Sequence, residues 1–256
     1  MKKILLTNDD GVHSPCLEDL RKSLSRLGEV TVVVPEKEMS TVSHSLTLNH
    51  PLRVQKIRKN VYITNGTPSD CINIAVLEIF KTKPDIVVSG INMGPNIGDD
   101  VTYSGTVAAS IEATLRGMTS FAISLAAFKD YKFDAALEFS YIMASEILKR
   151  GLPKRMFLNV NVPNIPLKEI KGVEITHQAK RVYKETLVKR IDPRGNAYFW
   201  LGGDAPSADF EKGSDYSAVL KNKISIMPVQ LDLTDYKMIN KLKSWDIRTS
   251  KKSEKK

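Results

Sequence analysis

Residues 3–34 read KILLTNDDGVHSPCLEDLRKSLSRLGEVTVVV, and this stretch decides the fold. Its two ends, 3–7 and 30–34, are apolar runs rich in Val, Ile and Leu, which is typical of strands buried on both faces. Between them, leucines recur at helical spacing from 17 to 27, and Gly28 follows as a stop signal. The stretch therefore predicts a strand–helix–strand unit with parallel strands and a right-handed crossover.

The same alternation continues further along the chain. Helices are predicted at 70–80, 106–117 and 134–150, and buried strands at 85–89, 121–125 and 156–160. Repeated strand–helix alternation favours an α/β fold, with a Rossmann-like, doubly wound, mostly parallel sheet and helices on both of its faces. We expect this catalytic core to occupy residues 1–165.

The pattern changes after residue 165. Alternating apolar and polar residues flank the turn-like Asp192-Pro193-Arg194-Gly195, which predicts a projecting β-hairpin over 181–202. An aromatic cluster on this hairpin (Tyr183, Tyr198, Phe199 and Trp200) would be costly to leave exposed. A strand at 223–227 and a helix at 234–245 complete a C-terminal part that spans 166–246. We expect the hairpin and this helix to form an oligomerisation extension, in a homodimer or homotetramer.

The composition is that of an ordinary globular protein, with 42% hydrophobic and 26% charged residues. Cys16 and Cys71 form no CxxC pair, which argues against a disulfide framework and favours a reducing compartment. The N-terminal apolar run stops at Asn8, too early for a signal peptide, and no run approaches the roughly 18 residues of a membrane span. We therefore expect a cytoplasmic location and no membrane contact.

The net charge of +9 raises the question of nucleic-acid binding. The last ten residues, 247–256, contain five Lys or Arg and one Glu, so +4 of the total lies in what we expect to be a disordered tail. The remaining excess is spread thinly, and no stripe of aromatic and basic residues accompanies it. We therefore expect no dedicated nucleic-acid binding.

Two adjacent carboxylates, Asp9 and Asp10, follow the first predicted strand. In open α/β sheets, ligands bind beyond the carboxyl ends of the strands. Paired carboxylates at that place are costly unless a cation neutralises them, and a hard divalent metal ion prefers oxygen ligands. The alternative for NDDG alone is an Asp-Gly turn beside a helix cap.

Three further segments reach the same predicted edge of the sheet. They are the hydroxyl-rich loop 40–47, the turn Asn65-Gly66-Thr67-Pro68, and the glycine-rich stretch 89–100, which ends shortly before Ser104, Gly105 and Thr106 open a helix. Glycines allow close backbone approach, and N–H groups at a helix N-terminus favour phosphate. There is neither a Walker loop nor a dinucleotide GxGxxG after the first strand. The combination predicts metal-assisted phosphoryl hydrolysis.

These motifs closely resemble those of the stationary-phase survival protein SurE family. They are NDDG at 8–11, HSLT at 44–47, NGTPSDC at 65–71, SGINMGPNIGDDVTYSGTVAAS at 89–110, DPRG at 192–195, FWLG at 199–202 and LTDY at 233–236. The resemblance covers nearly the whole chain. One departure is Cys16, where the family often has Gly after Pro.

The resemblance implies a divalent-metal-dependent 5′/3′-nucleotidase that hydrolyses nucleoside monophosphates, often with broader phosphatase or exopolyphosphatase activity. It implies one cation per subunit, Mg²⁺ or Mn²⁺, and the same oligomeric arrangement. The implied metal ligands are Asp9, Asp10, Ser40 and Asn92, of which Asp9 and Asp10 are also catalytic. The implied phosphate-binding residues are Asn96, Ser104, Gly105 and Thr106.

Several alternatives stay open at this point. Asp9 could form an aspartyl-phosphate, or the chain could bind nucleotides or metal in a regulatory role without turnover. His44 could contact the substrate or act as an acid, although a hydrogen bond that holds its loop is the favoured interpretation. Cys71 is interpreted as a small, buried packing residue.

Overall fold

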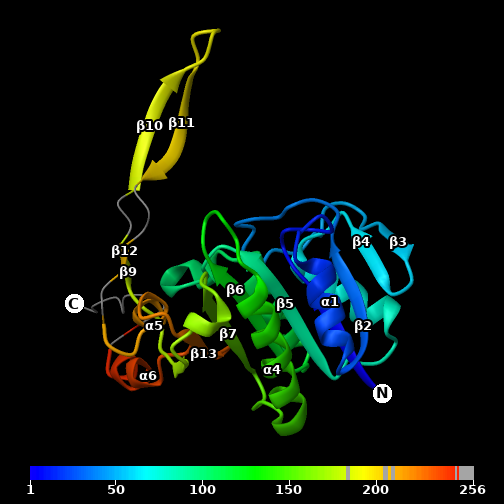
Figure 1. The fold of residues 1–256 in the computed structure, drawn as a ribbon. Helices are drawn as coiled ribbons and strands as arrows, with labels where there is room; N and C mark the ends of the chain where they lie inside the picture. Colours follow the sequence, from blue (N-terminus) through cyan, green and yellow to red (C-terminus); the bar gives the residue numbers. More distant parts are fainter. Residues whose placement is uncertain (183–184, 204–206, 209–210, 246, 248–256) are drawn as a thin grey trace, which may run out of the picture.

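The computed structural model describes residues 1–182, 185–203, 207–208, 211–245 and 247 (Figure 1). Its first elements are β1 (Lys2–Thr7), α1 (Leu17–Ser25) and β2 (Gly28–Pro35). β1 and β2 pair in parallel, with Ile4 opposite Val30. The strand–helix–strand unit predicted from the opening stretch is therefore confirmed.

Within the described residues, the central sheet has nine strands in the order β3-β4-β2-β1-β5-β6-β7-β13-β8. The strands not yet given are β3 (Val54–Arg58), β4 (Val61–Thr64), β5 (Ile86–Met93), β6 (Ser120–Ala126), β7 (Met156–Pro163), β8 (Val173–Ile175) and β13 (Ile224–Gln230). Pairing is parallel from β4 to β7, and it is antiparallel between β3 and β4 and between β7 and β13. The sheet is mostly parallel, as predicted.

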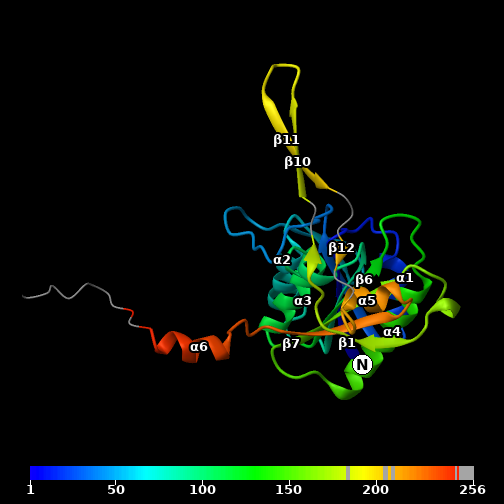
Figure 2. The same ribbon diagram turned by 90° about the vertical axis from the view of Figure 1, so that its left-hand side faces the viewer.

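Helices cover both faces of this sheet (Figures 1 and 2). Besides α1, they are α2 (Pro68–Ile74, continued by a π-type segment at Ala75–Ile79), α3 (Gly105–Leu115), α4 (Asp134–Arg150) and α5 (Asp215–Leu220). Alternate residues of β1 pack to opposite sides: Leu6 lies in one apolar cluster with Leu20 of α1, and Leu5 lies in another with Ile72 of α2. Because successive side chains of a strand point to opposite faces, this alternation buries β1 on both sides and confirms the doubly wound fold.

The C-terminal part adds to the same sheet. β13 pairs with β7, with Ile226 opposite Val160, and β8 pairs with β13. The helix predicted at 234–245 is α6 (Tyr236–Lys243), which stands away from the body of the molecule (Figure 2). Of the predicted tail, only Ile247 lies within the described residues. No helix in the described part of the chain is long and apolar enough to cross a membrane.

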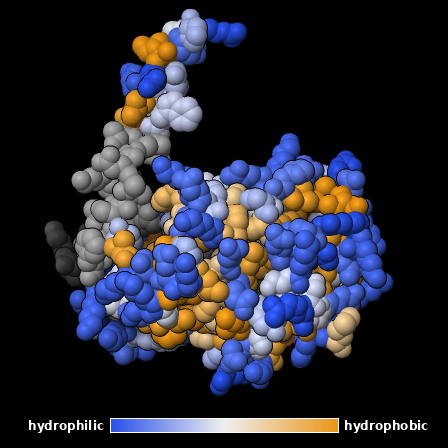
Figure 3. Space-filling model, viewed as in Figure 1, coloured by the Kyte–Doolittle hydropathy of each residue, from blue (hydrophilic) through white to orange (hydrophobic). Residues whose placement is uncertain are grey.

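The predicted hairpin projects from the body as β10 (Glu185–Ile191) and β11 (Ala197–Gly203) (Figure 1). Its turn is closed by the Gly195 N–H, which donates to the Asp192 carbonyl at 3.0 Å. At its base, β9 (Arg181–Val182) pairs with β12 (Ser207–Ala208). Apolar side chains are visible on the hairpin in Figure 3, and Trp200 is 64% exposed. Tyr183 of the predicted aromatic cluster lies outside the described residues.

Candidate active site

The turn after β1 presents both aspartates at the carboxyl edge of the sheet. Its geometry is fixed by Asn8, whose side-chain oxygen accepts from the Gly11 N–H at 3.1 Å while its amide donates to the Gly11 carbonyl at 3.0 Å. Gly11 has a φ of +80°, a conformation that few residues other than glycine adopt. Asp9 and Asp10 therefore stand at the place where open α/β sheets bind their ligands.

Asp9 is held by the N-terminus of α3. Its carboxylate accepts a hydrogen bond from the Thr106 N–H at 3.1 Å and another, short one from the Thr106 hydroxyl. Asp9 is only 4% exposed, and this burial raises the pKa of its carboxyl while the Thr106 bonds act in the opposite direction. A helix N-terminus also favours negative charge, so α3 orients Asp9 and helps to keep it ionised.

Gly105 lets α3 approach Asp9 this closely. A Cβ atom at this position would lie 2.9 Å from the Asp9 Cβ and 3.1 Å from the Met39 carbonyl oxygen. The preceding residue, Ser104, caps the helix, because its hydroxyl accepts from the Val107 N–H at 3.1 Å. The structure thus brings three of the four predicted phosphate-binding residues, Ser104, Gly105 and Thr106, to one helix N-terminus beside Asp9.

Asp10 contains a buried carboxylate oxygen, Oδ2, that has no hydrogen-bond partner among the described residues. A backbone hydrogen bond from Met93, at the end of β5, stabilises the charged form of its carboxyl. Burial, then the charge of Asp9, then that of Glu38 raise the pKa of Asp10 to about 7. A buried polar atom without a partner costs about 1–3 kcal/mol, and more when the group is charged. A cation bound at this oxygen would remove that cost.

The loop after β2 brings Ser40 to the same edge. The Met39 N–H donates to the Asp9 carbonyl at 2.8 Å, which anchors the start of the loop. The exposed Ser40 hydroxyl donates to Glu38 Oε1 at 2.6 Å. Glu38 is near enough to raise the pKa values of both aspartates. Sequence reasoning missed this third carboxylate, although it lies two residues before a predicted ligand.

Asn92 is placed by an irregularity in β5. The register with β6 shifts between Ser89 and Asn92, and Gly90 has a φ of +136° at that point. A Cβ at Gly90 would lie 2.3 Å from the Ile123 carbonyl oxygen, so only glycine fits there. A bulge of this kind turns the following side chain. The Asn92 amide donates to the Gly94 carbonyl at 2.8 Å, which leaves its Oδ1 as the atom able to bind a cation.

Asn96 lies in a buried polar network that supports the glycine-rich loop. Its N–H donates to Asn161 Oδ1 at 2.9 Å, and its carbonyl accepts from the Asn159 amide at 2.8 Å and from the Asn161 amide at 2.9 Å. Its own amide donates to the Ser124 hydroxyl at 2.8 Å. Asn96 therefore anchors the loop, and its contact with phosphate stays a prediction. Sequence reasoning missed Asn159 and Asn161, although two asparagines in an otherwise apolar strand were a visible signal.

The residues present fit a divalent metal ion with oxygen ligands. Asp9 and Asp10 supply carboxylates, Ser40 a hydroxyl and Asn92 an amide oxygen, which are the ligand types of Mg²⁺ and Mn²⁺. The described residues contain no group of three or more His, Cys, Asp or Glu placed to hold a metal. Ser40 and Asn92, which make up half of the predicted ligand set, are not among these four residue types.

The two cysteines take no part in this arrangement. Both are buried and unpaired with each other. Burial raises the pKa of the Cys16 thiol and of the Cys71 thiol, so both stay protonated and unreactive at neutral pH. Cys71 packs in the apolar cluster beneath α2 and α3, which agrees with its interpretation as a packing residue.

The fold and these contacts define a class: a doubly wound α/β protein with an acidic, hydroxyl-rich site where the ends of β1 and β5 meet the N-terminus of α3. Within that class, residues 4–185 match the family model described as "Survival protein SurE". The chain belongs to the SurE family.

Relatives agree over almost the full length. The chain is 48% identical to a 5′-nucleotidase SurE of Geobacter sulfurreducens, over 95% of this chain and 94% of the relative. It is 49% identical to a 5′-nucleotidase SurE of Geotalea uraniireducens, over 96% and 99%. Its fold matches the crystal structure of the SurE protein from Aquifex aeolicus with a TM-score of 0.85, at 41% identity over 94% of this chain and 98% of that one.

Proposed function

We propose that this phosphoric monoester hydrolase is a nucleotidase, which cleaves nucleoside monophosphates into nucleoside and inorganic phosphate with one divalent cation per subunit. Full-length similarity to curated 5′-nucleotidases supports the substrate class. The observation that supports the cation is the buried Asp10 Oδ2 beside Asp9 at the edge of the sheet, for which the described residues offer no hydrogen-bond partner. Activity on 3′-nucleotides and on short polyphosphate belongs to the same proposal.

Four side chains would hold the cation: Asp9, Asp10, Ser40 and Asn92. A divalent ion held there supplies a Lewis acid for the phosphate oxygens and a bound water of lowered pKa. Asp9 is oriented for this role by Thr106, because both of its oxygens accept hydrogen bonds from that residue. Asp10 supplies an oxygen that has no hydrogen-bond partner within the described part of the chain. Burial and the charges of Asp9 and Glu38 raise the pKa of Asp10 to about 7, and a nearby cation would favour its charged form.

The N-terminus of α3 would receive the phosphate group. The positive end of its dipole stabilises negative charge that develops during hydrolysis, although the Thr106 N–H already donates to Asp9 and the Val107 N–H to the Ser104 hydroxyl. Gly105 keeps the first turn of this helix close to Asp9, and the Ser104 cap fixes the turn's geometry. The substrate phosphate would then lie between the carboxylate pair and the helix.

The same proposal includes assembly into a homodimer or homotetramer, with the hairpin and α6 packed between subunits. It also includes a cytoplasmic location. Two-stranded hairpins are at best marginally stable alone, and this one exposes Leu187, Phe199 and Trp200. No residue of α6 is buried in the single chain. Light scattering at micromolar concentration tests the assembly, and a monomer would contradict it.

Phosphate release tests the catalytic proposal. Wild type, Asp9→Asn and Asp19→Asn would be compared on 5′-AMP, 3′-AMP, an aryl phosphate and short polyphosphate, with Mg²⁺, Mn²⁺ or EDTA. Asp19 is the matched control, because it lies on the surface of α1 and forms an exposed ion pair with Lys22. We expect metal-dependent release that falls by at least about 100-fold in Asp9→Asn, since outer-shell partners alone are worth 10–100-fold. A wild type inactive with every metal would refute the proposal.

A further inference from the structure

Residues 39–47 form a segment, here termed the strap, that carries Ser40 across the N-terminal ends of α2 and α3. Its beginning is tied to the site, where the Met39 N–H donates to the Asp9 carbonyl at 2.8 Å. Further on, the Ser43 N–H donates to the Tyr103 carbonyl at 3.0 Å, and the Ser43 hydroxyl donates to the Thr102 carbonyl at 2.9 Å. The strap therefore lies directly against the chain that leads into α3.

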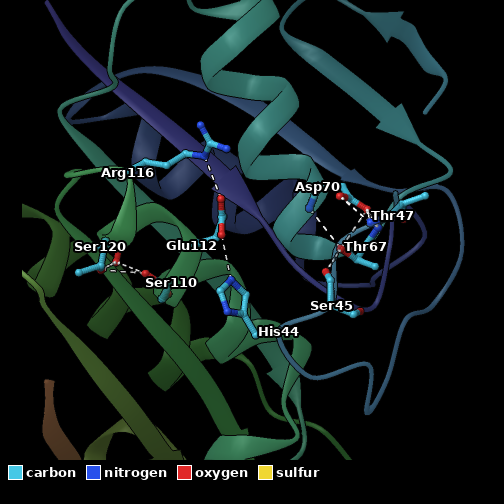
Figure 4. A network of polar contacts seen from close by, with 10 residues as sticks. His44, Ser45, Thr47, Thr67, Asp70, Ser110, Glu112, Arg116 and Ser120 are labelled. Carbon is cyan, nitrogen blue, oxygen red and sulfur yellow. Dashed lines mark hydrogen bonds and ion pairs between the residues drawn. The ribbon is translucent and has the colours of Figure 1, made fainter. Parts of the chain in front are cut away.

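The end of the strap is tied to the cap of α2 (Figure 4). The Thr47 N–H donates to both carboxylate oxygens of Asp70 at 3.2 Å, and the Thr67 hydroxyl donates to the Ser45 carbonyl at 2.8 Å. Thr67 and Asp70 also form the capping box that begins α2. The attachment at this end is thus built into a helix cap and does not depend on the active site.

Between these two ends, one side chain joins the strap to α3. His44 Nε2 donates to Glu112 Oε2 at 2.9 Å, and Arg116 Nε donates to the other oxygen, Oε1, at 2.9 Å (Figure 4). The Glu112 side chain is only 8% exposed, whereas that of His44 is 31% exposed. Glu112 is thus a nearly buried carboxylate whose two oxygens are each satisfied by one basic group.

The same helix therefore touches both halves of the candidate site. Through Thr106, α3 orients Asp9, and through Glu112 it holds the strap that carries Ser40. The Ser40 hydroxyl itself donates to Glu38, which belongs to the same loop. The position of Ser40 relative to Asp9 is accordingly set on one side by the bond from the Met39 N–H to the Asp9 carbonyl and on the other by the bonds that anchor the strap to the helices.

We propose that His44 and Glu112 are positioning residues that lock the strap to α3 and thereby hold Ser40 at the distance from Asp9 and Asp10 that cation binding requires. This inference rests on the metal site of the proposed function. His44 acts through the strap and touches neither of the aspartates.

The first test measures Mn²⁺ binding directly, by titration with electron paramagnetic resonance or calorimetry, alongside kcat and KM for 5′-AMP. The variants are His44→Ala and His44→Gln. The matched control is His50→Ala, because His50 is an exposed residue in a loop. We expect His44→Ala to weaken Mn²⁺ binding by about 10- to 100-fold, the usual effect of removing an outer-shell partner. His44→Gln should stay within about 3-fold of wild type, because its amide nitrogen occupies the place of Nε2 and still donates to Glu112.

A double-mutant cycle decides whether the effect passes through Ser40. If it does, His44→Ala should change Mn²⁺ binding little once Ser40→Ala is present. Full additivity of the two substitutions, a His44→Ala variant equal to wild type, or a His44→Gln variant as weak as His44→Ala would each overturn the proposal. A wild type that binds Mn²⁺ but releases no phosphate would refute the nucleotidase alone, since the strap is judged by Mn²⁺ affinity.

Discussion

The carboxyl edge of the sheet and the projecting hairpin are both built from hydrogen-bonded strands but bury their side chains differently. At the edge, β1 is flanked by β2 and β5, and its residues Ile4, Leu5 and Leu6 are fully buried. In the hairpin, β10 and β11 pair only with each other within the described chain, and Leu187 and Trp200 are more than 60% exposed.

This difference shows which contacts determine the structure of each region. Apolar burial contributes about 25 cal/mol per Å², so β1 is fixed by contacts inside one chain. The hairpin has the hydrogen bonds of a sheet without this contribution, and contiguous exposed apolar side chains mark a surface for association. One region is complete in a single chain, whereas the other needs a partner, which we propose to be a second copy.

The largest expected effect concerns the complete region. Gly105→Ala would place a methyl group 2.9 Å from the Asp9 Cβ and 3.1 Å from the Met39 carbonyl oxygen, so Asp9 or the strap must shift. We expect kcat/KM for 5′-AMP to fall by about 10- to 100-fold, because displacements of about 1 Å have effects of this size. Overpacking should also lower the free energy of unfolding by about 1–3 kcal/mol.

Gly151→Ala provides the control for this prediction. Gly151 ends α4 with a φ of +71°, and a Cβ there would meet nothing within 4 Å. It should therefore cost stability through backbone strain while kcat/KM stays at the wild-type value. Equal losses of activity in the two variants would mean that the edge of the sheet responds to global stability and not to local spacing.

The next effect concerns the incomplete region. Trp200→Glu should raise the dissociation constant of the oligomer by at least about 10-fold, because buried tryptophans dominate protein interfaces. Light scattering across a concentration series measures the change. Phe128→Glu is the control: Phe128 is 71% exposed but lies outside the hairpin and α6. If both substitutions, or neither, dissociate the oligomer, the hairpin is not the site of assembly.

Much of the fold could be predicted from local patterns. The helix expected at 134–150 has those bounds in α4, because an amphipathic stripe and a terminal Gly151 are both visible in the sequence. The place of β13 could not be predicted, since the residues that pair antiparallel with β7 come from 64 (Ser225 with Asn161) to 74 (Gln230 with Met156) positions further on. Such long-range pairing depends on topology and leaves no periodic signal of its own.

The same division holds for the site. Asp9 and Asp10 are predictable as candidates because they come two and three residues after a buried strand, and the structure places them at the edge of the sheet. Glu112 was missed because it faces His44 from 68 positions away, on a helix whose other residues carry no charge. Local sequence thus identifies the groups that follow strand ends and overlooks the groups that hold those loops in place.

The smallest expected effect concerns two ion pairs in the body of the molecule, one nearly buried and one exposed. It tests whether burial changes how strongly an ion pair contributes to stability. The hydrogen bond from His44, with that from Arg116, lowers the pKa of Glu112 below its ordinary value of 4.5. A carboxyl whose pKa is lowered in the folded state stabilises the protein at pH values above its ordinary pKa. That stabilisation is lost as the pH falls through the lowered pKa. The difference in free energy of unfolding between wild type and Glu112→Gln, below about 2 kcal/mol, should shrink as the pH falls from 6 to 3.

Glu146 of α4 is the exposed counterpart, since it pairs with Lys149 and Arg150 and its pKa is lowered by the same kind of contact. Chemical denaturation at low salt and at 0.5 M salt, where the Debye length is about 4 Å, distinguishes the ion pairs of Glu112 and Glu146. The proteins compared are wild type, Glu112→Gln and Glu146→Gln. Salt should abolish the pH-dependent difference at Glu146, because water and ions screen it, and should leave most of the difference at Glu112. Equal screening at both positions would show that Glu112 is solvated in solution, and the strap would then lack the rigid anchor on α3 that its role requires.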